Sequence, residues 1–194
     1  MIYVLSMYDK APNGAIEINT TSRDVGIFQN LSPFKLGPCQ LYNDYVSLNM
    51  ENAWQYSKVY AHHVDENNMP TKEYFEWAKN GWNKKWADRY PMGKGAKPLF
   101  SWWHDEPLDY IEARKHIYVP LYVERVILTD AYKELTSMHN NGQDIALRDF
   151  DGYMYNEMGY TLSDVLNNPN KKMGHSFVLA MLLTNDSVLQ ECTL

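Results

Sequence analysis

The sequence contains very little cysteine and no long apolar run. Its 194 residues include only two cysteines, Cys39 and Cys192. Two cysteines are too few for a disulfide framework, and these two are wrongly spaced for a cysteine-based zinc site. No stretch approaches the roughly 18 apolar residues of a membrane span, and the N-terminus lacks the basic start and apolar core of a signal peptide. We therefore expect a cytoplasmic protein that enters no membrane and binds no metal.

The sequence also lacks an excess of positive charge. Its formal net charge is −6, which argues against a protein that holds long duplex DNA through many phosphates. Hydrophobic residues make up 45% of the chain and aromatic residues 14%, which is ample material for a core. The length suits one compact domain, so we expect residues 1–194 to form a single domain.

Local patterns predict an α+β fold, a mostly helical domain around a few short strands. Residues 2–8 and 15–21 are rich in β-branched and aromatic residues and flank a turn with Pro, Asn and Gly, which predicts an opening hairpin. Further strands are expected within 39–43 and 143–155. Helical periodicity predicts one helix that starts near Met50, capped by Ser47 or Asn49. Further helices are expected over 72–90, over 109–139 with a bend or break at Pro120, and over 171–185.

One polar stripe stands out on the helix expected to start near Met50. At about 100° per residue, four polar side chains share one narrow arc beside Trp54, namely Glu51, Gln55, Lys58 and His62. If the arc faces solvent, it is an ordinary charged helix surface. If it lines a pocket, a carboxylate can manage protons there and a desolvated lysine can lose its proton near neutral pH and attack the anomeric carbon of a sugar.

Five segments occur in the order typical of one enzyme family. These are "INTTSRDVGIFQNLSPFKLGP" with "NMENAWQYSKVY", then "MGKGAKPLFSWW", a long helix, "LRDFDGY" and "KKMGHSFVLAMLL". Together they resemble the NADAR family, which includes the YbiA-like N-glycosidases, over most of residues 16–184. The resemblance implies a NADAR-like fold for the whole chain.

The resemblance also implies a reaction, the cleavage of a ribosyl–nitrogen bond. The substrate would be nucleotide-like: either ADP-ribose attached to guanine of nucleic acid, so that cleavage reverses ADP-ribosylation, or a phosphorylated ribosylamino-pyrimidine. Lys58 would attack the anomeric carbon to give an imine, Glu51 would act as acid and base, and Gln55 would orient ribose hydroxyls. This chemistry needs no cofactor and no metal.

Several further residues are candidates through weaker matches. Asp149 and Asp151 of "DFDG" correspond loosely to the family's late acidic element and are candidate catalytic carboxylates, with Tyr153 as an aromatic platform; a strand end with a turn is the simpler interpretation. Asn30 matches a loop Asn that would contact sugar or base, or it is an ordinary turn residue. The family's His after the Glu is Asn52 here, so His62 is a candidate substitute.

Two more segments suggest contacts to a nucleotide. Lys94 and Lys97 lie in a glycine-containing loop that could meet a phosphate or pyrophosphate, or form a surface turn. Trp103 could stack on a base, or belong to the core. Two other functions stay open: a module that binds ADP-ribose or a nucleotide without cleaving it, and a tyrosine-rich protein-interaction or inhibitory protein.

Overall fold

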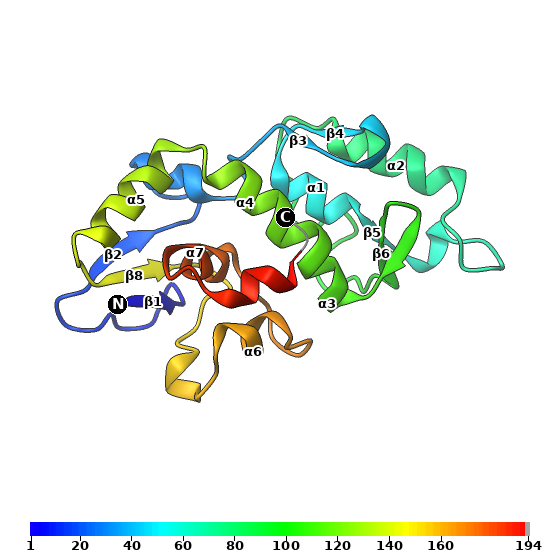
Figure 1. Cartoon of the computed structure of the whole chain (residues 1–194). Coiled ribbons are helices and arrows are strands. Elements are labelled where there is room, and N and C mark those ends of the chain that lie inside the picture. Colours follow the sequence, from blue (N-terminus) through cyan, green and yellow to red (C-terminus); the bar gives the residue numbers. More distant parts are fainter. Residues whose placement is uncertain (193–194) are drawn as a thin grey trace.

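Two short strands near the N-terminus and a third from much later in the chain form one parallel sheet. In this computed structural model, which describes residues 1–192, β8 (Ile145–Arg148) lies between β1 (Ile2–Leu5) and β2 (Ile16–Asn19). Val4 and Ile18 both stand opposite Leu147 in the register. The helix α7 (His175–Leu183) packs against β1 (Figure 1), and nearly all of its residues are buried, as its uniformly apolar sequence predicts.

The predicted hairpin of residues 2–8 and 15–21 is wrong, although both strands exist. The first three residues of β8 are fully buried, and a central place between two parallel neighbours is what such an apolar strand requires. The connection between β1 and β2 is held instead by Arg148. Its guanidinium donates hydrogen bonds to the carbonyl oxygens of Ser6 at 2.9 Å and Asp9 at 2.8 Å, and it pairs with the Glu17 carboxylate.

The other half of the molecule is built around α1 and two small antiparallel sheets. Asn49 caps α1 by accepting the backbone N–H of Asn52 at 2.8 Å, which confirms one of the two expected caps. The helix is shorter than expected, because Lys58 and Val59 leave it to form a strand. The elements of this half are α1 (Met50–Tyr56), α2 (Lys72–Trp82), β3 (Cys39–Gln40) paired with β4 (Val46–Ser47), and the sheet β5 (Lys58–Val59), β6 (Phe100–Trp103), β7 (Glu106–Leu108).

A set of consecutive helices joins the two halves. The helical segment expected to bend or break at Pro120 continues through it, with a change of helix type just before the proline. Pro120 lies in the first turn of α4, directly after a π-helical turn, and that wider turn accommodates the missing N–H. The break lies later, where Thr129 caps the next helix. The consecutive helices are α3 (Tyr110–Ala113), the π-helical turn Arg114–Tyr118, α4 (Val119–Val126) and α5 (Asp130–Asn140), and α6 (Leu162–Leu166) follows later, after β8.

Short 3-10 turns complete the α+β arrangement, and one predicted helix ends early. α2 ends at Trp82, so Trp86 lies outside it with 84% of its surface exposed. Among residues 1–192, no helix is long and apolar enough to cross a membrane. The 3-10 turns are Ile27–Leu31, Tyr42–Asp44, Ala61–His63, Asn156–Met158 and Ser187–Glu191.

Candidate functional site

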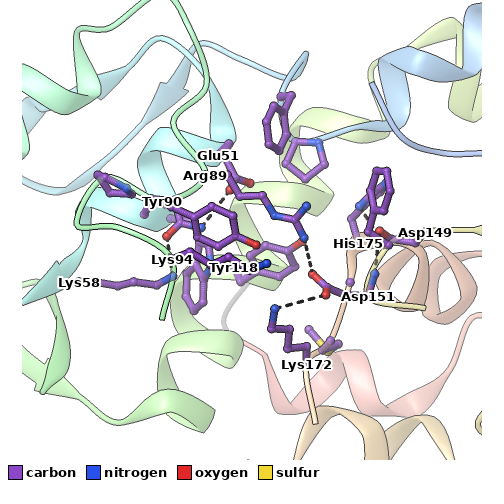
Figure 2. A pocket seen from close by; sticks show the side chains of 18 of the residues that line it. Glu51, Lys58, Arg89, Tyr90, Lys94, Tyr118, Asp149, Asp151, Lys172 and His175 are labelled. Carbon is purple, nitrogen blue, oxygen red and sulfur yellow. Dashed lines mark hydrogen bonds and ion pairs between the residues drawn. The ribbon is translucent and has the colours of Figure 1, made fainter. Parts of the chain in front are cut away.

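A cavity of about 590 Å³ opens where the two halves of the molecule meet. Its walls come from α1, from β5, from the segment 89–98, from the loop that follows β8 and from the start of α7 (Figure 2). Pockets for nucleotide-sized ligands span about 300 to 1,000 Å³, so this one is large enough for such a ligand.

Three residues of the predicted polar stripe form a hydrogen-bonded chain in the first wall. Gln55 Nε2 donates to Glu51 Oε1 at 2.9 Å, and Lys58 Nζ donates to Gln55 Oε1 at 2.8 Å. The Lys58 ammonium also lies 4.7 Å from the ring centre of Trp54. Although Lys58 belongs to β5 and not to α1, its side chain lines the same cavity as those of Glu51 and Gln55.

Burial changes the protonation of both ends of this chain. Desolvation lowers the pKa of Lys58 from 10.5 to about 8, against the opposing effect of Glu51. At pH 7 about one molecule in ten then carries a neutral Lys58 amine, against about one in 3,000 for an ordinary lysine. Burial likewise raises the pKa of Glu51, although Gln55 and Lys58 oppose the shift. The first wall therefore combines an amine that loses its proton more easily than an ordinary lysine with a carboxyl that binds its proton more tightly than an ordinary glutamate.

The opposite wall contains a buried ion pair. His175 Nδ1 lies 3.0 Å from Asp149 Oδ2, and its Nε2 lies 2.8 Å from the Thr20 carbonyl oxygen. Because both ring nitrogens face acceptors, the ring is an imidazolium. Burial disfavours both charges, but the attraction between them and their hydrogen bonds outweigh this effect, so the pKa of Asp149 is lowered and that of His175 is raised. Ser176 adds backbone and hydroxyl donors to the same carboxylate oxygen at 3.3 and 3.1 Å.

The segment 89–98 reaches across the cavity between these walls. Arg89 Nη2 pairs with Asp151 Oδ2 at 3.1 Å, and Lys172 Nζ lies 3.6 Å from Asp151 Oδ1 (Figure 2). The buried amide of Asn52 holds the preceding residues 84–88, because it donates to two backbone carbonyls and accepts the N–H of Asp88. One face of α1 thus lines the cavity while another positions Arg89.

Cationic side chains surround the cavity. Arg114 is buried below it and donates to the carbonyl oxygens of Val165, Leu166 and Asn168, which anchors the segment leading to α7. The guanidinium groups of Arg23 and Arg89 lie 4.8 and 5.7 Å from the ring centre of Phe150. Besides Lys58 and the His175 imidazolium, the lining cations are Arg23, Arg89, Lys94, Arg114 and Lys172, against the acidic residues Glu51, Asp149 and Asp151. This excess of positive charge suits an anionic ligand.

The structure gathers about half of the candidate residues at this cavity. The lining includes Glu51, Gln55, Lys58, Lys94, Asp149 and Asp151. It does not include Asn30 and Lys97, which are exposed, or His62, which lies on the exposed 3-10 turn after β5. Trp103 packs against Tyr42 with ring centres 5.1 Å apart, and Tyr153 packs against Phe177 at 4.7 Å. Both aromatic side chains are partly buried and pack against the hydrophobic core.

The sequence patterns did not single out several cavity residues, among them Arg89, Tyr118 and His175. Arg89 lies inside the helix expected over 72–90, and Tyr118 lies inside the helix expected over 109–139, where nothing in the periodicity marks either as part of a site. His175 begins the apolar α7, so its only signal in the sequence was a polar residue beside a glycine. Gly174 is required there, because a Cβ atom at this position would lie 2.1 Å from Asp149 Oδ2.

Within residues 1–192, no group of His, Cys, Asp and Glu side chains is arranged to hold a metal ion. The chain matches no family model, no curated protein and no solved structure. The resemblance to the NADAR family therefore stays a prediction from the segments quoted above.

Proposed function

We propose that this protein is an N-glycosidase that hydrolyses a ribosyl–nitrogen bond through an imine on Lys58. The observation that carries the proposal is the chain from Lys58 through Gln55 to Glu51, set in the wall of a cavity with several cations. A partly buried lysine with a pKa of about 8 has the property that imine chemistry requires, a neutral amine near physiological pH.

The first half of the reaction replaces the base with the amine. The neutral Lys58 nitrogen attacks C1′ of the ribose, the bond from C1′ to the base nitrogen breaks, and the base leaves with the proton of the Glu51 carboxyl. The new secondary ammonium on Lys58 then returns a proton to Glu51. The raised pKa of Glu51 suits this role, because the acid must be protonated before the base departs.

The second half opens the sugar and releases it. The nitrogen lone pair of Lys58 forms the imine as the bond from C1′ to the ring oxygen breaks, and Glu51 protonates that oxygen. Water then adds to the imine carbon with Glu51 as the base. Collapse of this adduct frees the sugar aldehyde and restores the neutral amine and the protonated carboxyl, so one water is consumed for each base released.

The surrounding residues support a phosphate-bearing substrate. Arg23, Lys94 and Lys172 line the cavity as exposed cations, and both candidate substrates, an ADP-ribosylated guanine in nucleic acid and a phosphorylated ribosylamino-pyrimidine, carry phosphate. Gln55 fixes the spacing between nucleophile and acid. It lies between the two groups in the hydrogen-bonded chain, and because its amide does not titrate, the acid must be Glu51.

The experiment is mass spectrometry of the protein incubated with each substrate class, with borohydride added to reduce any imine. Release of base and a reduced adduct on Lys58 are expected, and Lys58→Ala should show neither. Lys133→Ala is the matched control, because Lys133 is an exposed lysine on α5 paired with Asp130. Intact substrates that remain bound to the wild-type protein would favour a binding module instead. Turnover by a folded Lys58→Ala variant would refute the nucleophile.

A further inference from the structure

Tyr118 forms part of the cavity floor. It closes the π-helical turn before α4, only 8% of its surface is exposed, and it lines the cavity. Its ring packs against Trp54 with centres 5.2 Å apart and stacks on Tyr122 at 6.4 Å. In Figure 2 its side chain lies in the middle of the cavity, between the wall of Lys58 and the wall of Asp149. The packing fixes the ring, so the hydroxyl has a defined place.

The hydroxyl of Tyr118 has no hydrogen-bond partner among residues 1–192, and it is not sealed in the core. Two other tyrosines with fully buried side chains do have partners: Tyr122 donates to the Leu31 carbonyl oxygen at 2.7 Å, and Tyr74 donates to the Ser57 carbonyl oxygen at 3.1 Å. Buried phenols normally find such partners. A hydroxyl that lines a cavity without one is placed to contact a ligand.

The neighbouring charges define what kind of contact this is. Burial, and then the negative charges of Asp149 and Glu51, raise the pKa of Tyr118 well above its ordinary value, so the phenol keeps its proton and can donate. Asp149 Oδ2 already accepts three hydrogen bonds, whereas Oδ1 has only a long 3.4 Å contact with the N–H of Asp151. The Tyr118 hydroxyl is therefore a neutral donor, and Oδ1 of Asp149 is a carboxylate acceptor with room for a further hydrogen bond.

We propose that Tyr118 and Asp149 read a single sugar hydroxyl, the 2′-hydroxyl of a ribose, and so select ribosyl over 2′-deoxyribosyl ligands. The phenol donates to that hydroxyl while the carboxylate accepts from it, which uses both capacities of an alcohol. The 2′-position is chosen because it adjoins C1′, the carbon that Lys58 attacks. This inference rests on the proposed function, since it takes the ligand to be a ribosyl compound placed against Lys58.

A missing hydroxyl would leave both groups unpaired, which is why such sites discriminate strongly. A binding measurement tests this without any turnover. The full chain carrying Lys58→Met, which forms no imine, is titrated by calorimetry with ribose 5-phosphate and with 2-deoxyribose 5-phosphate. We expect ribose 5-phosphate to bind at least about tenfold more tightly, the ratio expected for one lost hydroxyl contact in a buried site.

Adding Tyr118→Phe should reduce that ratio to about twofold or less, mainly by weakening ribose 5-phosphate. Tyr42→Phe is the matched control, because the Tyr42 hydroxyl is also buried without a partner but lies among Tyr45, Trp82 and Trp103, away from the cavity. A preference that survives Tyr118→Phe would overturn the inference, as would a parent protein with no preference or with no binding of either sugar. Selective binding without glycosidase activity would support the inference and reject only the proposed reaction.

Discussion

Replacing Lys58 by methionine should stabilise the protein and do so in a pH-dependent way. The side chain keeps its length and its packing on Trp54 but loses a charge that burial disfavours. The pKa of Lys58 falls from 10.5 to about 8, a difference of about 2.5, which corresponds to about 3 kcal/mol at roughly 1.4 kcal/mol per unit. The hydrogen bond to Gln55 is lost and offsets about 1 kcal/mol. We expect a net gain of about 1 to 3 kcal/mol at pH 7.

The sign of the pH dependence follows from proton binding. Below pH 8 Lys58 is charged in both the folded and the unfolded state, and the folded state bears the full cost of burial. Between about pH 8 and pH 10.5 the folded protein holds fewer protons than the unfolded chain, so the wild-type free energy of unfolding rises with pH relative to the variant. The advantage of Lys58→Met should therefore be greatest below pH 8 and shrink toward pH 10.5.

Urea denaturation of both proteins from pH 6 to pH 10 measures this difference. The comparison removes contributions from other groups that titrate in this range, because they are common to both proteins. Lys94→Met is the control: Lys94 lines the same cavity but is exposed, so its replacement should change the free energy of unfolding by less than about 0.5 kcal/mol. A Lys58→Met variant no more stable than wild type at pH 7, with no pH trend, would refute the view that this amine is desolvated.

Three further predictions concern the walls of the cavity. Asn52→Ala should lower the free energy of unfolding by about 2 to 3 kcal/mol, since the fully buried Asn52 amide makes three partly buried hydrogen bonds to the segment before Arg89 and all three are lost. A loss under about 0.5 kcal/mol in urea would contradict their contribution. Gly174→Ala should cost about 2 kcal/mol or more, because the new Cβ atom meets the Asp149 carboxylate at 2.1 Å, and an unchanged melting temperature would disprove that contact. The ion pair of Asp149 and His175 should stabilise the fold fully only between about pH 3.8 and 6.5, the ordinary pKa values of the two groups. Below this range Asp149, whose pKa is lowered in the folded protein, becomes protonated and its contribution to stability is lost. Above it, the contribution of His175, whose pKa is raised, is lost as the pH rises through the folded pKa. The stability difference between wild type and His175→Asn should then decline from pH 6 toward pH 10, and a constant difference would count against the imidazolium.

The Glu51–Gln55–Lys58 chain shows why part of the site could be predicted. Glu51 and Gln55 are four residues apart on one helix, so their contact depends on local geometry alone. The helical spacing predicts that Lys58 belongs to the same helix, but α1 ends at Tyr56 and Lys58 pairs with Ser101 in a strand. Its ammonium group still donates to Gln55, because the Lys58 side chain points toward α1 even though its backbone has left the helix. His62, four residues further on, did not follow the helical spacing and lies outside the cavity.

The strands β1 and β2 illustrate the opposite case. Their composition predicts strands, but composition does not say which strand lies beside which. The partner of both is β8, which is more than 120 residues away along the chain, and no local signal in residues 2–21 refers to it. The short turn between them suggested a hairpin, and the burial demanded by the apolar β8 outweighed it.

The sequence by itself determined the features that depend on neighbours along the chain: the capped start of α1, the apolar α7, the strand character of β1, β2 and β8, and the polar face that begins at Glu51. The tertiary structure alone decided which of these meet. It placed Lys58, Asp149 and His175 around one cavity, lowered the pKa of the lysine by burial, and brought Arg89 across to Asp151. Burial and charge–charge contacts depend on what surrounds a group in three dimensions, and residues far apart in the sequence supply those surroundings.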